Sequence, residues 1–249
     1  MLNNQTIQGL HSLRLSAMAA GLIHQRQSAE YQMLDFEERL GMLVDQEITE
    51  RENRRLSRLL RAAKLRHDAV VSDIDFYHQR GLERSQVLSL AEGSWISHHH
   101  ALSVVGPTGT GKTYLACALA RAGIEKGNSA LYLRAPRMFE LLEMSRLDGR
   151  LQSLRASWSR IEILIIDDFL IRPLTAAQAG DLLEIVEDRT GAHSTILTSQ
   201  LPISDWHASM GDETLADSIL DRLSQNLHRI ELFGESMRKV KSHAQVDAV

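Results

Sequence analysis

An eight-residue loop between residues 106 and 113 combines the residue types that bind phosphate groups. It matches the pattern G-x-x-x-x-G-K-[ST] at every fixed position, and it lies between the apolar run LSVV and the helical pattern TYLACALARAGIEK. Glycines let backbone N–H groups turn towards an anion, and a helix that begins directly after the loop adds further unpaired N–H groups. The loop residues and the tyrosine that follows are Gly106, Pro107, Thr108, Gly109, Thr110, Gly111, Lys112, Thr113 and Tyr114.

Two side chains of this loop have separate expected roles. Lys112 supplies a positive charge for the β- and γ-phosphates, and the hydroxyl of Thr113 is suited to ligate Mg²⁺. The alternative is a chance match, but the strand expected before the loop and the helix expected after it argue against chance. The loop therefore predicts a site for ATP or ADP with Mg²⁺.

A second pattern places two carboxylates at the end of an apolar run. Residues Ile163 to Ile166 are all apolar, and Asp167 and Asp168 follow them directly. A central strand that is buried on both faces delivers such residues to the carboxyl edge of a parallel sheet. We expect Asp167 to hold Mg²⁺ and Asp168 to orient or deprotonate the attacking water. The alternative is a solvated turn between a strand and a loop.

Polar residues also end the run STILTSQ, which begins at Ser194. If this run is another strand of the same sheet, Ser199 or Gln200 lies where the γ-phosphate or a water molecule can be sensed. The alternative is that these polar residues only begin a loop.

Two arginines near the C-terminal end are candidates for contacts with the nucleotide. Arg222 ends the helical pattern DSILDR, and Arg238 follows the last apolar run. An arginine finger stabilises charge on the transferred phosphoryl group, and hydrolysis depends on assembly when a neighbouring subunit supplies the finger. We expect this role for Arg222, as a catalytic residue beside Lys112, Asp167 and Asp168, and a nucleotide-sensing role for Arg238. The alternatives are a helix-surface ion pair for Arg222 and a merely basic tail for Arg238.

The elements that must position these residues form an α/β pattern. From Ala101 onward, short β-rich runs alternate with helical patterns, which predicts a central parallel sheet flanked by helices. The expected strands are Leu102–Val105, Ala130–Arg134, Ile163–Asp167, Ser194–Ser199 and Arg229–Phe233. Before Arg66, apolar residues at three- and four-residue spacing predict a small all-helical region. We expect a helical domain over residues 1–70, a linker over 71–100 that packs on the core, and a nucleotide-binding domain over 101–249.

Positive charge is concentrated in residues 51–66. The whole chain has a net charge of −4, yet this segment has seven basic residues and Glu52 as its single acid. On a helix, its arginines fall within one sector of about 140°, a face that can neutralise the phosphates of duplex DNA with little regard to sequence. The alternative is a solvated basic helix, or one paired with acidic residues of 30–52. The candidate DNA contacts are Arg51, Arg54, Arg55, Arg58, Arg61, Lys64 and Arg66.

Composition narrows the class of protein. The single cysteine, Cys117, cannot form an internal disulfide, which favours a reducing compartment. The N-terminus lacks the pattern of a signal peptide, and the longest strongly apolar stretch is far shorter than the roughly 20 residues of a membrane span. We therefore expect a soluble cytoplasmic protein with no membrane partner. The adjacent histidines His98–His100 lack the spacing of a structural metal site, so no transition metal is expected.

Taken in order along the chain, these segments resemble the IstB family of insertion-sequence ATP-binding proteins. The resemblance rests on LHSLRLSAMAAGL, RENRRLSRLLRAAKLRHDAVVSDIDF, GPTGTGKTYLACAL, ILIIDDF and DSILDRLSQNLHRIEL. It implies an AAA+ fold of the group that includes bacterial initiators and helicase loaders. It also implies an ATPase that forms a homo-oligomer with ATP on duplex DNA and engages a cognate transposase.

The chain departs from the AAA+ pattern at two places. Asp168 stands where glutamate is usual, which predicts slow or partner-dependent hydrolysis. Only about sixteen residues follow Phe233, too few for a C-terminal lid domain of typical size to support Arg238.

Three alternatives to a transposition helper remain. A helicase loader would favour a helicase and single strands, whereas the long arginine face favours duplex DNA. A small-molecule P-loop kinase would need an acceptor site, for which the sequence has no signature. A nucleotide-binding regulatory module would bind ATP with negligible turnover.

Overall fold

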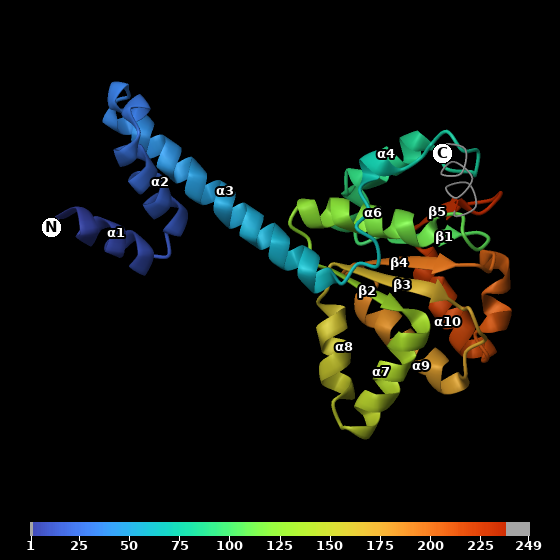
Figure 1. Cartoon of the computed structure of the whole chain (residues 1–249). Helices are drawn as coiled ribbons and strands as arrows, with labels where there is room; N and C mark the ends of the chain where they lie inside the picture. The colour runs from blue at the N-terminus through green and yellow to red at the C-terminus, as the bar shows by residue number, and fades with distance from the viewer. Residues whose placement is uncertain (1, 238–249) are drawn as a thin grey trace, which may run out of the picture. The chain divides into compact units, whose positions relative to one another are not determined.

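The computed structural model describes residues 2–237, and the chain divides into two compact units between Arg58 and Leu59 (Figure 1). Among the described residues, no helix is both long and apolar enough to cross a membrane.

The first unit is entirely helical. It contains α1 (Leu2–Ser12), α2 (Ser16–Gln27), the short 3₁₀ helix η1 (Ala29–Met33) and most of α3 (Phe36–Ala63), which continues past Arg58. The buried carboxylate of Glu47 on α3 accepts hydrogen bonds from the backbone N–H groups of Ala17 (2.9 Å) and Met18 (3.2 Å) at the start of α2. Because the first N–H groups of a helix have no partner inside the helix, Glu47 fixes α2 against α3.

The second unit contains a five-stranded, fully parallel sheet in the order β2-β3-β4-β1-β5. The strands are β1 (Ala101–Val105), β2 (Ala130–Arg134), β3 (Ile163–Phe169), β4 (Ser194–Ser199) and β5 (Leu227–Glu231). The five-strand prediction is confirmed, with three corrections to strand ends. β1 begins one residue earlier than predicted, at Ala101. β5 begins and ends two residues earlier than predicted, and β3 continues two residues further, through both aspartates.

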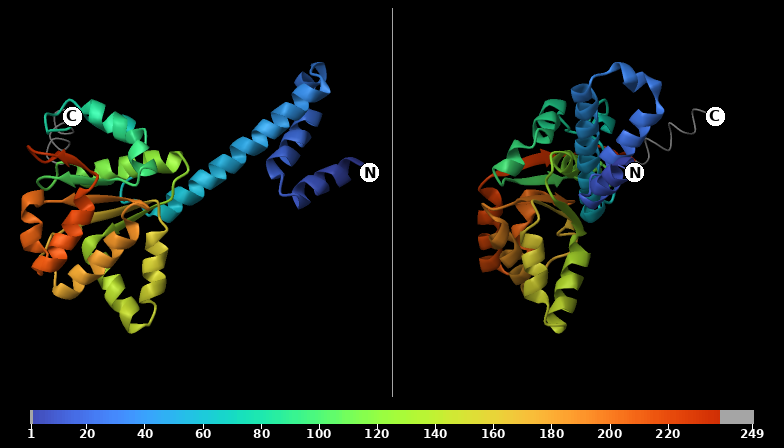
Figure 2. Two further views of the ribbon diagram at one scale, coloured as in Figure 1. Left: turned by 180° about the vertical axis from the view of Figure 1, so that it is seen from behind. Right: turned by 90° about the vertical axis from the view of Figure 1, so that its left-hand side faces the viewer.

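Helices cover both faces of this sheet, as Figures 1 and 2 show. Helix α6 (Lys112–Glu125) contacts β1 to β4 on one face and packs against α4 (Arg84–Ala91). The other face is covered by α7 (Ala135–Leu147), α8 (Leu151–Ser159), α9 (Ala176–Arg189) and α10 (Glu213–Ser224). The shorter elements are η2 (Val71–Asp73), α5 (Ser94–Ser97), η3 (Ile203–Asp205) and η4 (His207–Ser209).

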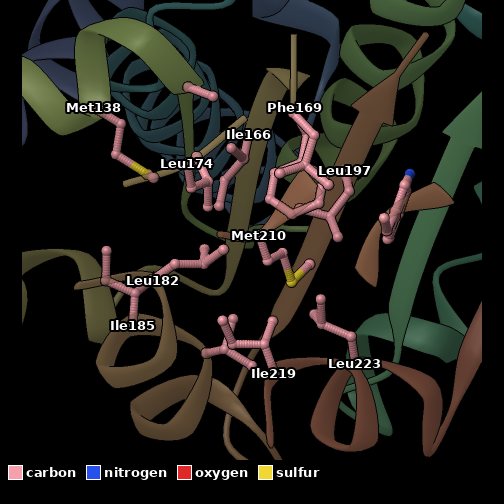
Figure 3. Close-up of a cluster of buried hydrophobic side chains, with 14 of the residues drawn as sticks. Met138, Ile166, Phe169, Leu174, Leu182, Ile185, Leu197, Met210, Ile219 and Leu223 are labelled. Atoms are coloured by element: carbon pink, nitrogen blue, oxygen red, sulfur yellow. The ribbon is translucent and has the colours of Figure 1, made fainter. Parts of the chain in front are cut away.

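Strand β3 is buried on both faces, as its continuous apolar run predicts. Its residues Leu164 and Ile166 join the core formed with α7 to α10 (Figure 3), whereas Ile163 lies near Gly123 of α6 on the opposite face. Full burial of each such side chain stabilises the fold by roughly 1.5–3 kcal/mol. This packing fixes the position at which β3 delivers Asp167 to the sheet edge.

Residues 71–100 also pack on the second unit. Trp95 is 1% exposed and its indole N–H donates to the carbonyl of Leu90 at 2.8 Å. The hydroxyl of Ser194, at the start of β4, donates to the carbonyl of Trp95 at 3.2 Å. This stretch therefore contributes α4, α5 and a buried aromatic anchor.

Candidate nucleotide site

The phosphate-binding loop connects the end of β1 to the first turn of α6. Gly106 and Gly111 have φ values of 144° and 100°, a region that favours glycine, and a Cβ on Gly106 would lie 2.1 Å from the carbonyl oxygen of Leu232. The N–H of Gly106 donates to the carbonyl of Ser199 (3.1 Å), and the N–H of Met237 donates to that of Gly109 (2.9 Å). Neighbouring strands and the segment after β5 thus hold the loop in place.

The ammonium group of Lys112 is folded back onto the loop. Its Nζ donates to the carbonyl oxygens of Gly106 at 2.7 Å and Pro107 at 2.8 Å, and the residue is 8% exposed. Burial lowers the pKa of Lys112, while Asp167 and Asp168 act in the opposite direction. The group is therefore a desolvated cation beside the loop, where phosphate oxygens would replace two carbonyl partners.

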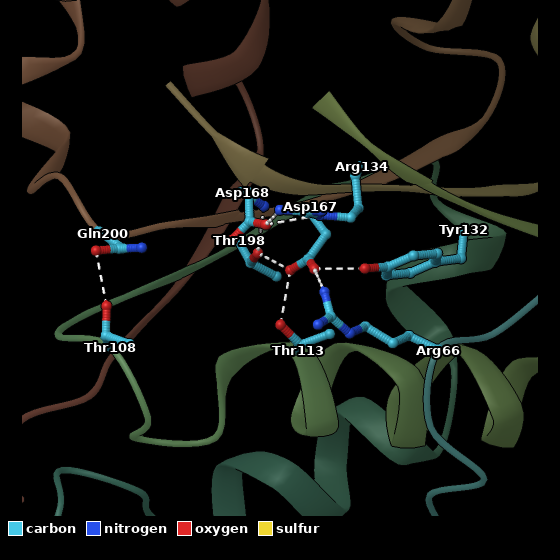
Figure 4. A network of polar contacts seen from close by, with 9 residues as sticks. All are labelled: Arg66, Thr108, Thr113, Tyr132, Arg134, Asp167, Asp168, Thr198 and Gln200. Atoms are coloured by element: carbon cyan, nitrogen blue, oxygen red, sulfur yellow. Dashed lines mark hydrogen bonds and ion pairs between the residues drawn. The ribbon is translucent and has the colours of Figure 1, made fainter. Parts of the chain in front are cut away.

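Asp167 is the centre of a polar network that joins four elements (Figure 4). Its Oδ1 accepts hydrogen bonds from the hydroxyls of Thr113 (2.8 Å) and Thr198, and its Oδ2 accepts one from Tyr132 (2.5 Å). Arg66 lies 3.8 Å from Oδ2. Asp167 is 0% exposed, so these contacts supply the compensation that a buried carboxylate requires.

The donor set around Asp167 fits Mg²⁺. This ion binds proteins through one or two carboxylates, retains waters and takes phosphate oxygens from the nucleotide. Asp167 and the Thr113 hydroxyl provide the carboxylate and the hydroxyl side by side, next to the loop that would hold the phosphates. Bound there, the ion would neutralise charge that develops on the phosphates.

Asp168 is held in a distinct conformation by its neighbours. Its φ of 57° lies in the left-handed region, and the register between β3 and β4 shifts between Ile166 and Phe169. Its Oδ2 accepts hydrogen bonds from Nε (2.9 Å) and Nη2 (2.7 Å) of Arg134, and its N–H donates to the Thr198 hydroxyl at 3.2 Å. The carboxylate therefore lines the pocket but is engaged by a cation.

The two candidate sensor residues differ in their surroundings. The hydroxyl of Ser199 is buried, donates to the carbonyl of Phe169 (2.8 Å) and accepts from the N–H of Leu201 (3.1 Å). The Oε1 of Gln200 instead accepts a hydrogen bond from the Thr108 hydroxyl in the phosphate loop, at 2.8 Å (Figure 4). Gln200 is therefore available to a nucleotide, whereas the Ser199 hydroxyl is used inside the fold.

One cavity of about 550 Å³ is lined by Lys112, Thr113, Asp168 and Gln200, together with residues from the segment before α4. That segment supplies Arg80, which the sequence analysis missed because no motif marks it. Arg80 is 8% exposed; its Nη1 donates to the carbonyl of Thr110 and its Nη2 to that of Asp75, both at 2.9 Å. Its buried Nε has no hydrogen-bond partner among the described residues. Arg80 therefore adds a buried cation to the phosphate loop.

Arg222 does not reach this cavity in its own chain. It lies in the last turn of α10, shortly before β5, and lines a separate pocket with His98, His99 and His193, which precede β1 and β4. Because all strands are parallel, this is the sheet edge opposite the phosphate loop. Its Nη2 donates to Glu187 at 3.0 Å and its Nη1 to the carbonyl of Ser218 at 2.9 Å. Arg238 lies outside the described residues.

The arginine-rich segment occupies the end of α3 and the residues after it. Arg51 pairs with Glu47 (2.9 Å) and Arg54 with Glu50 (2.8 Å), each one helical turn earlier. Most of the other basic side chains of the segment are exposed: Arg55, Arg58, Arg61 and Lys64. Arg66 differs from the other basic residues of this segment, because its guanidinium lies beside Asp167 in the nucleotide site.

The fold and this site define the class: the chain is a P-loop protein with the AAA+ fold. Three solved structures share the fold. These are DnaI (TM-score 0.57, 21% identity, covering 68% of this chain and 90% of that one), AMPPCP-bound DnaA from Aquifex aeolicus (0.59, 17%, 74% and 56%) and the DnaC helicase loader (0.54, 19%, 68% and 99%).

The sequence profile of the IstB-like ATP binding proteins matches residues 8–245, and the chain belongs to this family. A Sinorhizobium fredii protein named as an insertion sequence ATP-binding protein is 44% identical over 239 residues, covering 96% of this chain and 98% of the relative. A Mycobacterium tuberculosis relative, named as an ATP-binding protein in an insertion sequence, is 32% identical over 237 residues, covering 93% of each. The resemblance inferred from the motifs is confirmed.

Proposed function

We propose that this protein is an ATP-hydrolysing transposition helper, which assembles with ATP on duplex DNA and engages a transposase. The observation that carries the proposal is that Lys112, Thr113 and Asp168 line one cavity at the carboxyl edge of the sheet, while the buried Asp167 accepts a hydrogen bond from Thr113. Family membership supplies the biological context, because the relatives are named as ATP-binding proteins of insertion sequences.

Hydrolysis follows from the roles that the site geometry supports. Lys112 would turn from the loop carbonyls to the β- and γ-phosphates of a bound nucleotide, and Thr113 and Asp167 would hold Mg²⁺, which would neutralise charge on the phosphates. Asp168 accepts a proton from the attacking water, and Gln200 orients that water or the γ-phosphate. Because Asp168 starts in an ion pair with Arg134, its release precedes efficient turnover.

A neighbouring copy completes the site. Arg222 is 29% exposed in its side chain and lies at the edge of the sheet away from its own phosphate loop. An arginine in this position can act only on a nucleotide bound by another chain, where it would stabilise the transferred phosphoryl group. Its contact with the half-exposed Glu187 is a surface ion pair that an incoming phosphate would readily replace.

Duplex DNA is the proposed polyanionic partner of the arginine-rich helix. Arg58 and Arg61 are exposed and, within residues 2–237, make no hydrogen bond or ion pair. Contacts from such side chains go to backbone phosphates, so binding weakens steeply with salt and depends little on sequence. These properties favour binding to duplex DNA of any sequence over recognition of one specific sequence.

A helicase loader is the second candidate, favoured by the shared fold with DnaI and DnaC alone. The two functions differ in the form of DNA that promotes assembly. The test measures the mass of single particles in solution, always in the presence of ATP and Mg²⁺. Three samples are compared: the protein alone, the protein with duplex DNA, and the protein with single-stranded DNA. Lys112→Ala and Arg222→Ala are compared with Lys126→Ala, a control on the exposed end of α6.

A large assembly that needs ATP and duplex DNA, and that Lys112→Ala abolishes, supports the helper. Assembly on single strands alone supports the loader. A protein that stays monomeric with either form of DNA contradicts both the helper and the loader, and favours a self-contained kinase. If assembly occurs, single-turnover hydrolysis separates an ATPase from a nucleotide-binding regulatory module without turnover.

A further inference from the structure

Arg66 is the only cation within 4.0 Å of Asp167 among the described residues. Its Nη1 lies 3.8 Å from Oδ2 of Asp167, the oxygen that also accepts a hydrogen bond from the hydroxyl of Tyr132 (Figure 4). The side chain of Asp167 is 1% exposed and that of Arg66 is 42% exposed. A buried carboxylate therefore has a compensating cation that can withdraw towards solvent.

Arg66 and Mg²⁺ compete for the same carboxylate. The proposed metal position needs an oxygen of Asp167 and space for waters and phosphate oxygens. Two positive charges that share one carboxylate repel each other, most strongly where water is excluded. Tyr132 first, and Asp167 and Asp168 to a lesser extent, also raise the pKa of Arg66, so the guanidinium keeps its charge at every physiological pH.

The residues around Arg66 tie this contact to the end of α3. Helix α3 ends at Ala63, and Lys64 has a φ of 51°, a left-handed conformation that turns the chain away from the helix axis. The following residues lie along α6, the helix that begins at the phosphate loop. Asp68 forms an ion pair with Arg121, and the ring of His67 lies 6.0 Å from that of Tyr114.

We infer that Arg66 is a cationic placeholder at Asp167, displaced when Mg²⁺ and nucleotide bind. In the empty site it balances the charge of Asp167 and holds residues 64–68 against α6. When Mg²⁺ takes the carboxylate, Arg66 leaves, and the segment that directly follows the arginine-rich helix is released. Arg66 is then a positioning residue of the nucleotide site, in contrast to Arg61, which remains a candidate DNA contact.

This inference rests on the proposed Mg²⁺ site at Asp167, and a binding experiment on the full chain tests the two separately. Binding of a fluorescent, non-hydrolysable ATP analogue is measured while Mg²⁺ is titrated. The wild type and Asp167→Asn first establish whether Mg²⁺ tightens binding through Asp167. If the wild type shows no Mg²⁺ dependence, the metal site itself is wrong.

Given that dependence, Arg66→Gln is expected to lower the Mg²⁺ concentration at half-maximal tightening by about fivefold, the size set by a partly exposed ion pair. Arg66→Lys keeps the charge and should stay within about twofold of the wild type. Arg61→Gln, the matched control, should leave the Mg²⁺ midpoint unchanged. Arg66→Met provides a second neutral side chain if Arg66→Gln does not fold.

Amide hydrogen exchange of residues 64–68 gives a readout that does not depend on affinity. Exchange should rise in the wild type and in Arg61→Gln when Mg²⁺ and the analogue are added, and it should already be high in unliganded Arg66→Gln. The inference is overturned if Arg66→Gln matches the wild type in both the Mg²⁺ midpoint and exchange. It is also overturned if this variant only lowers the salt dependence of duplex binding, as expected for Arg61→Gln.

Discussion

The hydroxyl of Thr113 donates a hydrogen bond of 2.8 Å to Asp167, although 54 positions separate the two residues in the chain. Thr113 is fixed in the first turn of α6 and Asp167 near the end of β3, so the contact exists only because α6 packs across the sheet. This pairing joins the phosphate loop to the acidic strand end.

Lys112→Ala should weaken binding of an ATP analogue by about 50- to 100-fold, because two charge-assisted contacts to phosphate are lost. Equilibrium titration of a fluorescent analogue measures this change. Lys126 is the control, because its Nζ donates to the carbonyl of Glu92 at 3.1 Å, away from the loop; Lys126→Ala should bind like the wild type. Similar affinities for the two variants would contradict the assignment of the loop.

Asp168→Asn should lower ATP hydrolysis by about 100-fold while binding persists, because an amide cannot accept the proton of the attacking water. Steady-state phosphate release and analogue titration measure the two properties. Equal hydrolysis by Asp168→Asn and the wild type would exclude Asp168 as the base.

Arg134→Gln should raise the basal hydrolysis rate of the protein without DNA by about threefold, because it frees the carboxylate of Asp168 from a partly exposed ion pair. Arg137→Gln is the control, since Arg137 pairs with Glu140 on the exposed surface of α7. A rate that falls in Arg134→Gln would show that Arg134 assists catalysis directly.

Gln200→Ala and Ser199→Ala should have opposite signatures. Gln200→Ala should lower kcat by about tenfold or more with little change in melting temperature, because it removes a polar group next to the phosphate loop. Ser199→Ala should lower stability by about 1–2 kcal/mol, because two buried hydrogen-bond partners lose the hydroxyl. Kinetics and thermal denaturation of both variants decide the assignment, and a kinetic defect confined to Ser199→Ala would reverse it.

Acidification should destabilise the second unit through His100. Burial first, and the nearby His228, His98 and His99 next, lower the pKa of His100 below its usual 6.5. Between this lowered pKa and 6.5 the unfolded chain binds more protons than the folded one, so stability falls as pH drops through that window. The melting temperature should therefore be lower at pH 5.5 than at pH 7.5, and His100→Gln should reduce the difference. The exposed His11→Gln should leave it unchanged.

Local patterns were sufficient to predict the phosphate loop, the acidic pair and the five strands. Each depends on neighbours in sequence: glycines and Lys112 within eight residues, or an apolar run that ends in Asp167. The register of β2 against β3 is not local. It pairs Arg134 with Asp167, and so brings the Arg134 guanidinium to Asp168, a contact that no single segment encodes.

Arg80 and Arg66 show the same limit for charged residues. Both precede the phosphate loop by many residues, and no local pattern assigns either of them to the nucleotide site; only the packed fold brings them to the cavity. For Arg66 the helical periodicity pointed to the arginine-rich face, because the sequence does not reveal that α3 ends at Ala63 and the chain turns at Lys64. The sequence also does not show that Ser199 is buried while Gln200 is accessible, because this difference depends on the shift in register between β3 and β4 after Ile166.

The most direct test of an ATPase site completed by a second copy is a mixing experiment with Asp168→Asn and Arg222→Ala. The first variant binds ATP and retains Arg222, and the second retains a full phosphate site without the arginine. Each should be inactive alone, and a one-to-one mixture with ATP, Mg²⁺ and duplex DNA should recover roughly a quarter of wild-type phosphate release through interfaces that combine both intact halves. A mixture as inactive as its components, or full activity of Arg222→Ala alone, would contradict the proposal.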